Sequence, residues 1–235
     1  MSTATISSLC SRRFTTIPTP RNVLVLGGGD YLATWRVLMR RGVEHVKIAD
    51  WDKGVAELIL THIPAVAALG IHHDRRVDFR EEIDVIEYLP RTEERFDVVI
   101  GDLTDVTTLG RLLPNVAREI ARVLAPGGVF VTQAGELSLA AKPLAELAAS
   151  VTLFKGLFRS VWISGYHIES FAYTQCFLTA WKDRRVEPYP PRQRDFAKRF
   201  DGREVEKDRL FYGPAIHRAG FTIDPTIKAA LGLAV

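Results

Sequence analysis

The chain has 235 residues, of which 47% are hydrophobic and 25% are charged, proportions typical of a globular protein with a sizeable core. The 31 basic and 28 acidic side chains leave a net charge of +3, too close to balance to favour a nucleic-acid-binding protein. Two cysteines, Cys10 and Cys176, provide neither a disulfide framework nor a metal-binding spacing. Because there is no long apolar run and no secretory signal, we expect a cytoplasmic protein with no membrane partner.

The chain begins with residues 1–20, a Ser- and Thr-rich stretch that ends in IPTP and is predicted to be an N-terminal arm with room for a short helix. Residues 22–52 then predict a strand, a glycine turn, a helix and a second strand. The helix is expected to place Leu32, Trp35 and Leu38 on one face and to end near Gly42.

The glycine turn of Gly27–Gly29 follows a buried strand directly, and it lets a ligand lie against the backbone. Asp50 ends the next strand, 20 residues beyond Asp30, where a parallel βαβ unit places a carboxylate against ribose hydroxyls. A pyrophosphate beside Asp30 would be repelled. The pattern therefore favours a nucleoside with a positive charge, such as S-adenosylmethionine or decarboxylated S-adenosylmethionine.

Strand and helix patterns alternate through the rest of the chain. Further helices are predicted over 54–69 (broken near Pro64), 84–89, 111–124 and 138–154, and further strands over 76–80, 96–101, 129–132, 159–163 and 173–181. This order predicts an α/β fold, a doubly wound Rossmann-like sheet that is mostly parallel with an antiparallel edge pair. Residues 21–235 are expected to form one nucleoside-binding catalytic domain with a C-terminal extension, interrupted by a charged excursion over 183–209.

Acidic residues stand at or just after the predicted strand ends, which meet at one edge of such a sheet. They are Asp30, Asp50, Asp84, Asp102 and, in the loop DLTD, Asp105. Each alone is typical of a helix cap or a solvated turn. Five on one rim favour a cationic cofactor and a basic, amine-bearing acceptor.

These segments resemble the spermidine and spermine synthases, the aminopropyltransferases, over residues 21–235. NVLVLGGGD resembles their first motif, ADWD their ribose motif, and DVIEYL their adenine segment. FDVVIGDLTDV resembles the segment that carries their presumed catalytic base, and FYGPAIHRAGFTIDPTIKAAL resembles their C-terminal motif. The last match separates the chain from generic methyltransferases. The resemblance also implies the fold of class I S-adenosylmethionine-dependent methyltransferases.

The chain departs from the family pattern at several positions. GGGDGG has become GGGDYL, which would put bulky Tyr31 and Leu32 beside the cofactor site. Val106 replaces a proline, and Phe171 stands where many members have a substrate-contacting tyrosine. The family's N-terminal β-domain has no counterpart before the first strand. These departures imply a wider acceptor side, a longer or partly apolar amine, and poor use of putrescine.

The resemblance implies roles residue by residue. Asp102 would be the catalytic base. Asp30 would bind the aminopropyl amine and exclude the carboxylate of S-adenosylmethionine. Asp50 would bind the ribose hydroxyls, and Asp84 would bind the adenine amine. Trp51 would either stack on adenine or merely cover a helix. The acceptor-binding candidates are Asp105, Gln133 and Phe171. The cofactor-binding candidates are Gly27, Gly28, Gly29, Asp30, Asp50, Trp51, Asp84, Val85, Asp102 and Leu103.

The expected function is transfer of an aminopropyl group from decarboxylated S-adenosylmethionine to an amine, with release of methylthioadenosine and without a metal. One alternative is a methyltransferase, 3-amino-3-carboxypropyltransferase or cyclase that uses S-adenosylmethionine on the same scaffold. A non-catalytic nucleoside-binding subunit is another, and the retained acids argue against it. The acceptor and the oligomeric state stay open, with a homodimer as one alternative.

Overall fold

The structure is a computed structural model that describes residues 20–40, 42–79, 82–103, 106–183, 185 and 219–233, with the side chains of 106–113 and Ser170 excepted. The predicted N-terminal arm, the predicted acceptor residue Asp105 and almost all of the charged excursion therefore lie outside the described residues. The first half of the C-terminal motif, up to residue 218, lies outside them as well.

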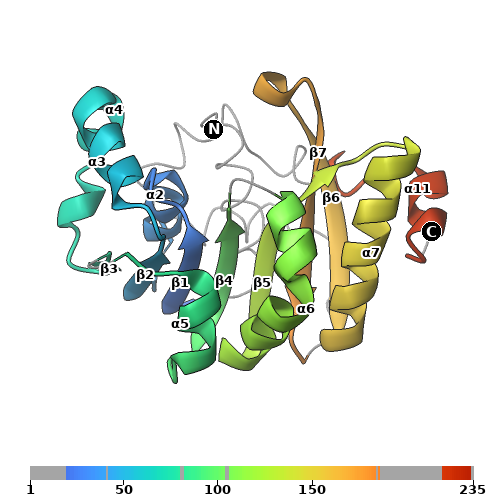
Figure 1. Ribbon diagram of the computed structural model, residues 1–235, viewed down its shortest axis with the longest axis horizontal. Coiled ribbons are helices and arrows are strands. Elements are labelled where there is room, and N and C mark those ends of the chain that lie inside the picture. Colours follow the sequence, from blue (N-terminus) through green and yellow to red (C-terminus); the bar gives the residue numbers. More distant parts are fainter. Residues whose placement is uncertain are drawn as a thin grey trace.

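The described residues form a seven-stranded sheet with the order β3-β2-β1-β4-β5-β7-β6 (Figure 1). Strands β3 to β5 are parallel neighbours, and β7 pairs antiparallel with both β5 and β6. The predicted fold class, with its antiparallel edge pair, is confirmed. The strands are β1 Asn22–Gly27, β2 His45–Ala49, β3 Val77–Asp78, β4 Phe96–Asp102, β5 Leu124–Glu136, β6 Ser160–Ile168 and β7 Tyr173–Trp181.

Helices cover both faces of the sheet. One core, which includes Leu24, Phe130 and Val151, lies under α5, α6, α7 and α11, and the first three of these stand in front of the sheet in Figure 1. A second core, which includes Val25 and Ile100, lies under α2 on the opposite face. The helices are α2 Leu32–Leu38, α3 Lys53–His62, α4 Pro64–Ala67, η2 Ile71–His73, α5 Val85–Arg91, α6 Val106–Val123, α7 Ala141–Leu157, η3 Glu169–Phe171 and α11 Pro225–Ala230.

Several predicted boundaries differ from the structure where pairing with neighbours overrides local signals. The strand predicted over 129–132 runs from Leu124 to Glu136, because backbone pairing with β4 and β7 extends it through the proline and glycines at its start. The strand predicted over 76–80 is two residues long, since it is an edge strand paired only with β2.

Helix α2 places Leu32, Trp35 and Leu38 against one cluster of neighbours, so these residues share a face as predicted. Its side towards the sheet carries Ala33 and Val37, whose small side chains let the helix pack closely against β1 and β2. Leu32, Trp35 and Leu38 are only partly buried, and all three pack on a third cluster that contains residues of α3 and α4. The apolar stripe of this helix therefore faces its neighbouring helices more than the sheet.

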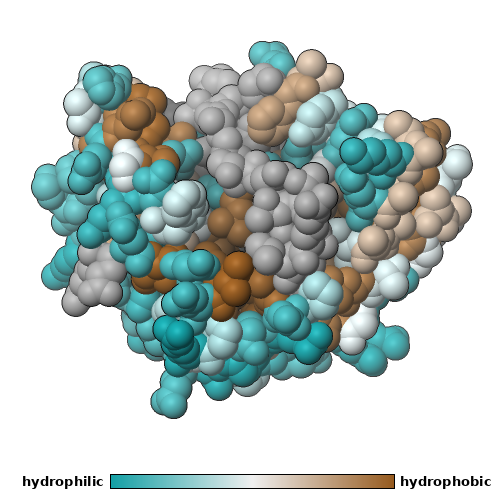
Figure 2. Space-filling model, viewed as in Figure 1, coloured by the Kyte–Doolittle hydropathy of each residue, from teal (hydrophilic) through white to brown (hydrophobic). Residues whose placement is uncertain are grey.

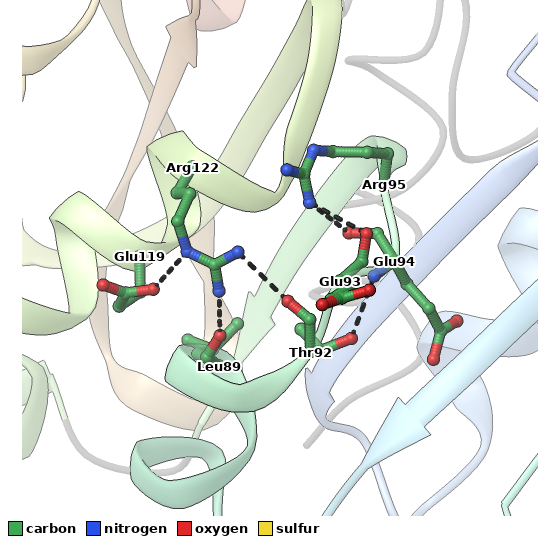
Figure 3. A network of polar contacts seen from close by, with 7 residues as sticks. All are labelled: Leu89, Thr92, Glu93, Glu94, Arg95, Glu119 and Arg122. Atoms are coloured by element: carbon green, nitrogen blue, oxygen red, sulfur yellow. Dashed lines mark hydrogen bonds and ion pairs between the residues drawn. The ribbon is translucent and has the colours of Figure 1, made fainter.

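A guanidinium ties α5 to α6 (Figure 3). Arg122 of α6 pairs through Nε with Glu119 at 2.6 Å and donates to the backbone carbonyl of Thr92 at 3.0 Å. It also donates to the carbonyl of Leu89. These carbonyls belong to the last turn of α5, whose oxygens have no partners within the helix. The contact fixes the far end of the helix that begins after Asp84.

No single helix among the described residues is long and apolar enough to cross a membrane. Helix α3 and the segment 64–73 meet the length and composition criteria only together, and the two are bent by 100°. Figure 2 shows apolar atoms on the surface over α3 and α4. The exposed apolar side chains there are Val55, Leu58, Ile63 and Leu69.

Candidate active site

Residues of three neighbouring strands, β1, β4 and β5, meet at one edge of the sheet. In the ladder, Gly27 of β1 pairs with Asp102 of β4, and Gly101 pairs with Thr132 of β5, so that Gln133 follows beside Asp102. Side chains alternate along a strand. Since Ile100 belongs to the core under α2, Asp102 points to that face as well. The glycine turn, the acid and the amide thus meet at the carboxyl ends of the strands.

The glycine turn lies directly against Asp102. A Cβ placed on Gly27 would come within 2.5 Å of the backbone oxygen of Asp102, and one on Gly28 would lie 3.7 Å from its Oδ2. Both glycines have positive φ, +80° and +83°, a region that other residues rarely adopt. Leu103 contacts the same turn, because its Cδ2 is 3.1 Å from the position of a Cβ on Gly27. These residues therefore form one compact wall.

Asp102 is a buried acid without a hydrogen-bond partner. It is 6% exposed, and neither carboxylate oxygen has a partner among the described residues. Burial raises the pKa of Asp102 to about 7, with smaller contributions in the same direction from the charges of Asp30 and Asp50. The amide of Gln133 opposes the rise, although its Nε2 lies outside hydrogen-bond geometry. A buried acid with a pKa near 7 suits proton transfer.

Asp30 accepts a hydrogen bond at the start of α2 through one carboxylate oxygen, and its other oxygen takes no part in that bond. Its Oδ1 accepts from the backbone N–H of Leu32 at 3.0 Å. Burial raises the pKa of Asp30, the Leu32 N–H opposes this, and Asp50 adds to the rise. A cation bound here would stabilise the charged forms of Asp30 and Asp102.

Asp50 connects the glycine turn to α3. Its Oδ2 accepts from the N–H of Gly29 at 2.9 Å, and its Oδ1 accepts from the N–H of Asp52 at 3.1 Å. A carboxylate oxygen accepts more than one hydrogen bond, so both oxygens keep capacity for hydroxyl donors. Trp51 beside it is 72% exposed and has room to cover a bound ring.

Asp84 caps α5, as predicted, by accepting from the N–H of Ile86 at 2.8 Å. The loop before it is attached to the same rim, because the N–H of Ile83 donates to the backbone oxygen of Asp50 at 2.8 Å. Val85, the first residue of α5, packs in part against the front core. The described acids of the predicted rim are therefore joined through backbone contacts or through their charges.

Tyr31, which the sequence predicts beside the cofactor site together with Leu32, follows Asp30 directly and packs its ring on the α3 side. Its ring is buried on the α3 side in a cluster with Ile48, Val66 and Ile71, and it stands edge-on to Phe79 at 5.8 Å between centroids. Its backbone has φ +61°, the left-handed region, immediately before α2. The ring thus occupies a cavity between β2 and the short helices, at the cost of backbone strain.

We expect Tyr31→Gly to lower stability even though glycine relieves the backbone strain. Loss of a buried ring costs about 3–5 kcal/mol, and relief of a left-handed residue returns about 1–2 kcal/mol. The net loss should be about 2 kcal/mol in urea unfolding. Tyr31→Phe is the matched control and should stay within about 1 kcal/mol, since it keeps the ring. A gain in stability for the glycine variant would contradict this account.

Two of the predicted acceptor-binding residues, Gln133 and Phe171, lie on β5 and η3, and β7 runs beside β5. Phe171 stacks on Tyr173, with ring centroids 5.5 Å apart and an interplanar angle of 23°. Gln133 is buried, and so is Gln175 of β7, which the sequence analysis did not select. The signal was present, because Gln175 is a polar residue at an inward position of an apolar strand. Predicted Asp105 lies outside the described residues.

No group of three or more His, Cys, Asp or Glu in the described part of the chain is arranged to hold a metal ion. The rim acids are instead spread along separate strand ends and are engaged with backbone N–H groups.

The family model for the spermine/spermidine synthase domain matches residues 8–187, more than half of the chain. The chain belongs to the spermine/spermidine synthase family. Its resemblance to the aminopropyltransferases, a family of transferases, is thereby confirmed.

Curated relatives and solved structures agree with this assignment. The chain is 29% identical over 219 residues to the polyamine aminopropyltransferase of Thermococcus kodakarensis and 31% identical over 220 residues to that of Serratia proteamaculans; each match covers 91% of this chain and 72% of the relative. A spermidine synthase in complex with the transition-state analogue AdoDATO superposes with a TM-score of 0.77 at 22% identity, covering 99% of this chain and 76% of that one. The Thermotoga maritima spermidine synthase gives 0.77 at 20% identity, with 99% and 75% covered. These structures support the fold.

Proposed function

We propose that the chain transfers an aminopropyl group from decarboxylated S-adenosylmethionine to a small-molecule amine and releases methylthioadenosine. One observation carries this proposal above all. Asp102 is buried against the glycine turn with no hydrogen-bond partner in the described part of the chain, and Asp30 and Asp50 are close enough to raise its pKa. Its surroundings suit a ligand that brings positive charge and a transferable proton.

The reaction requires a neutral amine. An alkylamine with a pKa of roughly 10 is only about one part in a thousand neutral at pH 7. In the proposed step the amine nitrogen forms a bond to the aminopropyl carbon, the carbon–sulfur bond breaks, and its electron pair stays on sulfur as a neutral thioether. Asp102 accepts the proton that the nitrogen loses, and the strand ends hold the two reactants together.

The donor would lie along the rim of acids. Asp50 offers its remaining lone pairs to the ribose hydroxyls. Asp84 offers the adenine amine the oxygen that does not cap α5. Asp30 faces the aminopropyl ammonium and would repel the carboxylate of S-adenosylmethionine. Trp51 would stack on the adenine ring. The relatives named polyamine aminopropyltransferase support this donor.

For the acceptor we propose an amine that is longer or more apolar than putrescine. The stacked pair of Phe171 and Tyr173 presents aromatic surface on the acceptor side, and Phe171 has no hydroxyl to hold a short polar chain. An acceptor panel of putrescine, longer diamines, spermidine and bulkier amines tests this. The highest kcat/KM for putrescine would show that the chain prefers an ordinary short diamine.

The deciding experiment measures both products from both donors. We expect methylthioadenosine from decarboxylated S-adenosylmethionine and an amine, together with a rise in Tm on addition of methylthioadenosine. S-adenosylhomocysteine formed from S-adenosylmethionine would instead identify a methyltransferase. If neither donor reacts and neither methylthioadenosine nor decarboxylated S-adenosylmethionine changes Tm, the proposed function is wrong.

A further inference from the structure

Helix α3 is apolar on two opposite sides. Its inner side packs on the cluster around Tyr31 through Ala56, Ile59 and Leu60. Its outer side carries Val55 and Leu58, which are 40% and 58% exposed. A helix that is apolar all round is normally covered on all sides, and exposed apolar patches mark surfaces that bind a partner. The outer side of α3 is therefore a candidate interaction surface.

The outer apolar residues follow a regular spacing. Trp51, Val55, Leu58 and His62 are separated by four, three and four positions, and all four are exposed. This spacing places side chains in one line along a helix, the arrangement by which one helix packs along another. Trp51 extends the line from the position just before Asp52, the N-cap of α3. We call these four residues the α3 stripe, which lies in the apolar surface over α3 and α4 in Figure 2.

The α3 stripe borders the candidate active site at one end. Trp51 follows Asp50 directly, and the Cβ of Val55 lies 3.5 Å from the position of a Cβ on Gly29. In Figure 1, α3 and α4 stand at the β3 edge of the sheet, far from α7 and α11. A partner seated on the stripe would therefore also meet the ring of Trp51, which is 72% exposed.

The charge of this surface favours a second copy of the chain as the partner. With histidine counted as neutral, Glu57 is the one charged residue among the exposed positions from 51 to 69. Nucleic acids and charged peptides find no complementary charge there, and helices that lie on membranes normally carry Lys and Arg on their polar face. Two copies of the stripe, by contrast, meet without burying an unpaired charge. Two-fold pairs of identical chains are also the commonest closed oligomers.

Small residues flank the centre of the stripe. Gly54 and Thr61 lie one helical turn before and after Leu58, on the same side of the helix. In a two-fold pair whose helices run in opposite directions and cross at Leu58, Gly54 of each copy meets Thr61 of the other. Side chains of this size allow two helices to approach closely. Trp51 of each copy then faces the bend at Ile63 of the other, where the chain turns through 100°.

We propose that the α3 stripe is a two-fold interface between two copies of this chain, and that each copy holds the Trp51 ring of the other in place over the adenine of the donor. The second part rests on the proposed function, because it takes the adenine to lie against Trp51; the interface itself does not. An exposed side chain loses rotational freedom when it orders on a ligand, and a partner that already restricts the ring removes part of that cost.

The oligomeric state tests the interface. Light scattering after size exclusion, over a range of protein concentrations, should find a dimer for wild type. Leu58→Glu should be a monomer, since it places two like charges at the crossing point. Leu139→Glu is the matched control, because Leu139 is 56% exposed and lies outside the stripe, and it should remain a dimer. Both substitutions replace exposed side chains, so thermal unfolding should show folded proteins.

A cross-link tests the same contact without a destabilising charge. The two-fold axis places position 58 against itself, so Leu58→Cys should form a disulfide-linked dimer on mild oxidation. Leu139→Cys should not. Both are made with Cys10→Ser, and the remaining Cys176 is buried. A dimer that survives Leu58→Glu, or equal cross-linking at both positions, overturns the interface. A monomeric wild type overturns it too, and its sedimentation with phosphatidylcholine vesicles would identify a lipid surface instead.

Donor-site affinity tests the role of the partner at Trp51. In calorimetric titration, Leu58→Glu should raise the Kd for methylthioadenosine about tenfold, and Leu139→Glu should leave it within about twofold. Loss of the dimer with no change in this Kd overturns the contribution of the partner to the site. A wild-type dimer that binds no methylthioadenosine leaves the interface standing and refutes the proposed function, so the two failures are distinguishable.

Discussion

Asp102→Asn should lower the rate of aminopropyl transfer about a thousandfold, within the range expected for loss of a general base. Asparagine keeps the shape of the side chain and removes the proton acceptor. Donor affinity should stay within about tenfold, or 1.4 kcal/mol, because Asp30 and Asp50 keep their contacts with Leu32 and Gly29. Single-turnover kinetics and calorimetric titration with methylthioadenosine measure the two effects separately.

The pH dependence distinguishes a lost base from a disturbed site. In wild type, kcat/KM should rise with pH through about 7, where Asp102 loses its proton in the free enzyme. In the asparagine variant only amine that is already neutral reacts. Its residual rate should therefore rise about tenfold per pH unit up to the amine pKa of roughly 10. A residual rate that is flat with pH would indicate misplacement of the substrates.

The same substitution should stabilise the unliganded protein at high pH. The pKa of Asp102 rises from 3.8 in the unfolded chain to about 7 in the folded one. The folded state therefore binds the proton more tightly, and this stabilising contribution is complete below pH 3.8 and lost as the pH rises through 7. A pKa difference of about three corresponds to about 4 kcal/mol at most. Asp102→Asn should thus raise Tm at pH 8 and change it little at pH 4.

Asp97→Asn is a control on the same strand. Asp97 stands at the opposite end of β4 and accepts from the backbone N–H groups of Arg21 and Asn22. Asparagine keeps an accepting oxygen and loses the charge, which weakens these hydrogen bonds, so Tm should fall modestly without a change in the pH profile of turnover. If Asp102→Asn keeps most of the wild-type rate, Asp102 is not the base, and Asp105 of the same motif becomes the candidate.

Local signals in the sequence were sufficient for much of the site. The strand–turn unit before Asp30 follows from its apolar run and glycines, and the cap at Asp84 follows from its place before a helical segment. The run over β7 was predicted with its observed bounds, since β-branched and aromatic residues fill it. Each of these depends on neighbours in the chain.

What the sequence did not predict depends on contacts between distant segments. Tyr31 adopts a left-handed backbone because β2 and the short helices leave a cavity that its ring fills. Gln175 was not predicted as a buried polar residue, because its burial depends on β7 lying beside β5 in the sheet. In α2 the small residues face the sheet and the large ones pack against other helices, a division that apolar periodicity alone does not predict.

Asp30→Asn should change which donor the enzyme prefers. In the proposed complex the free oxygen of Asp30 faces the ammonium of the aminopropyl arm, where S-adenosylmethionine carries a carboxylate as well. A hydrogen bond to a charged group contributes about 1.5–3 kcal/mol. Removing the charge should therefore weaken decarboxylated S-adenosylmethionine about 10- to 100-fold and leave S-adenosylmethionine unchanged or bound more tightly. The ratio of the two Kd values is the measurement.

Asp30→Asn removes the charge of the side chain and should preserve the local fold. Asparagine retains an oxygen that accepts from the Leu32 N–H, so the start of α2 should be preserved. Loss of an acid also eases the repulsion at Asp102, since Asp30 is the charge that contributes most to its raised pKa after burial. The rising limb of kcat/KM should accordingly move to lower pH. Asp97→Asn should move neither the donor ratio nor this limb. An unchanged ratio in Asp30→Asn would show that Asp30 does not meet the aminopropyl amine, and a wild-type preference for S-adenosylmethionine would favour the methyltransferase alternative.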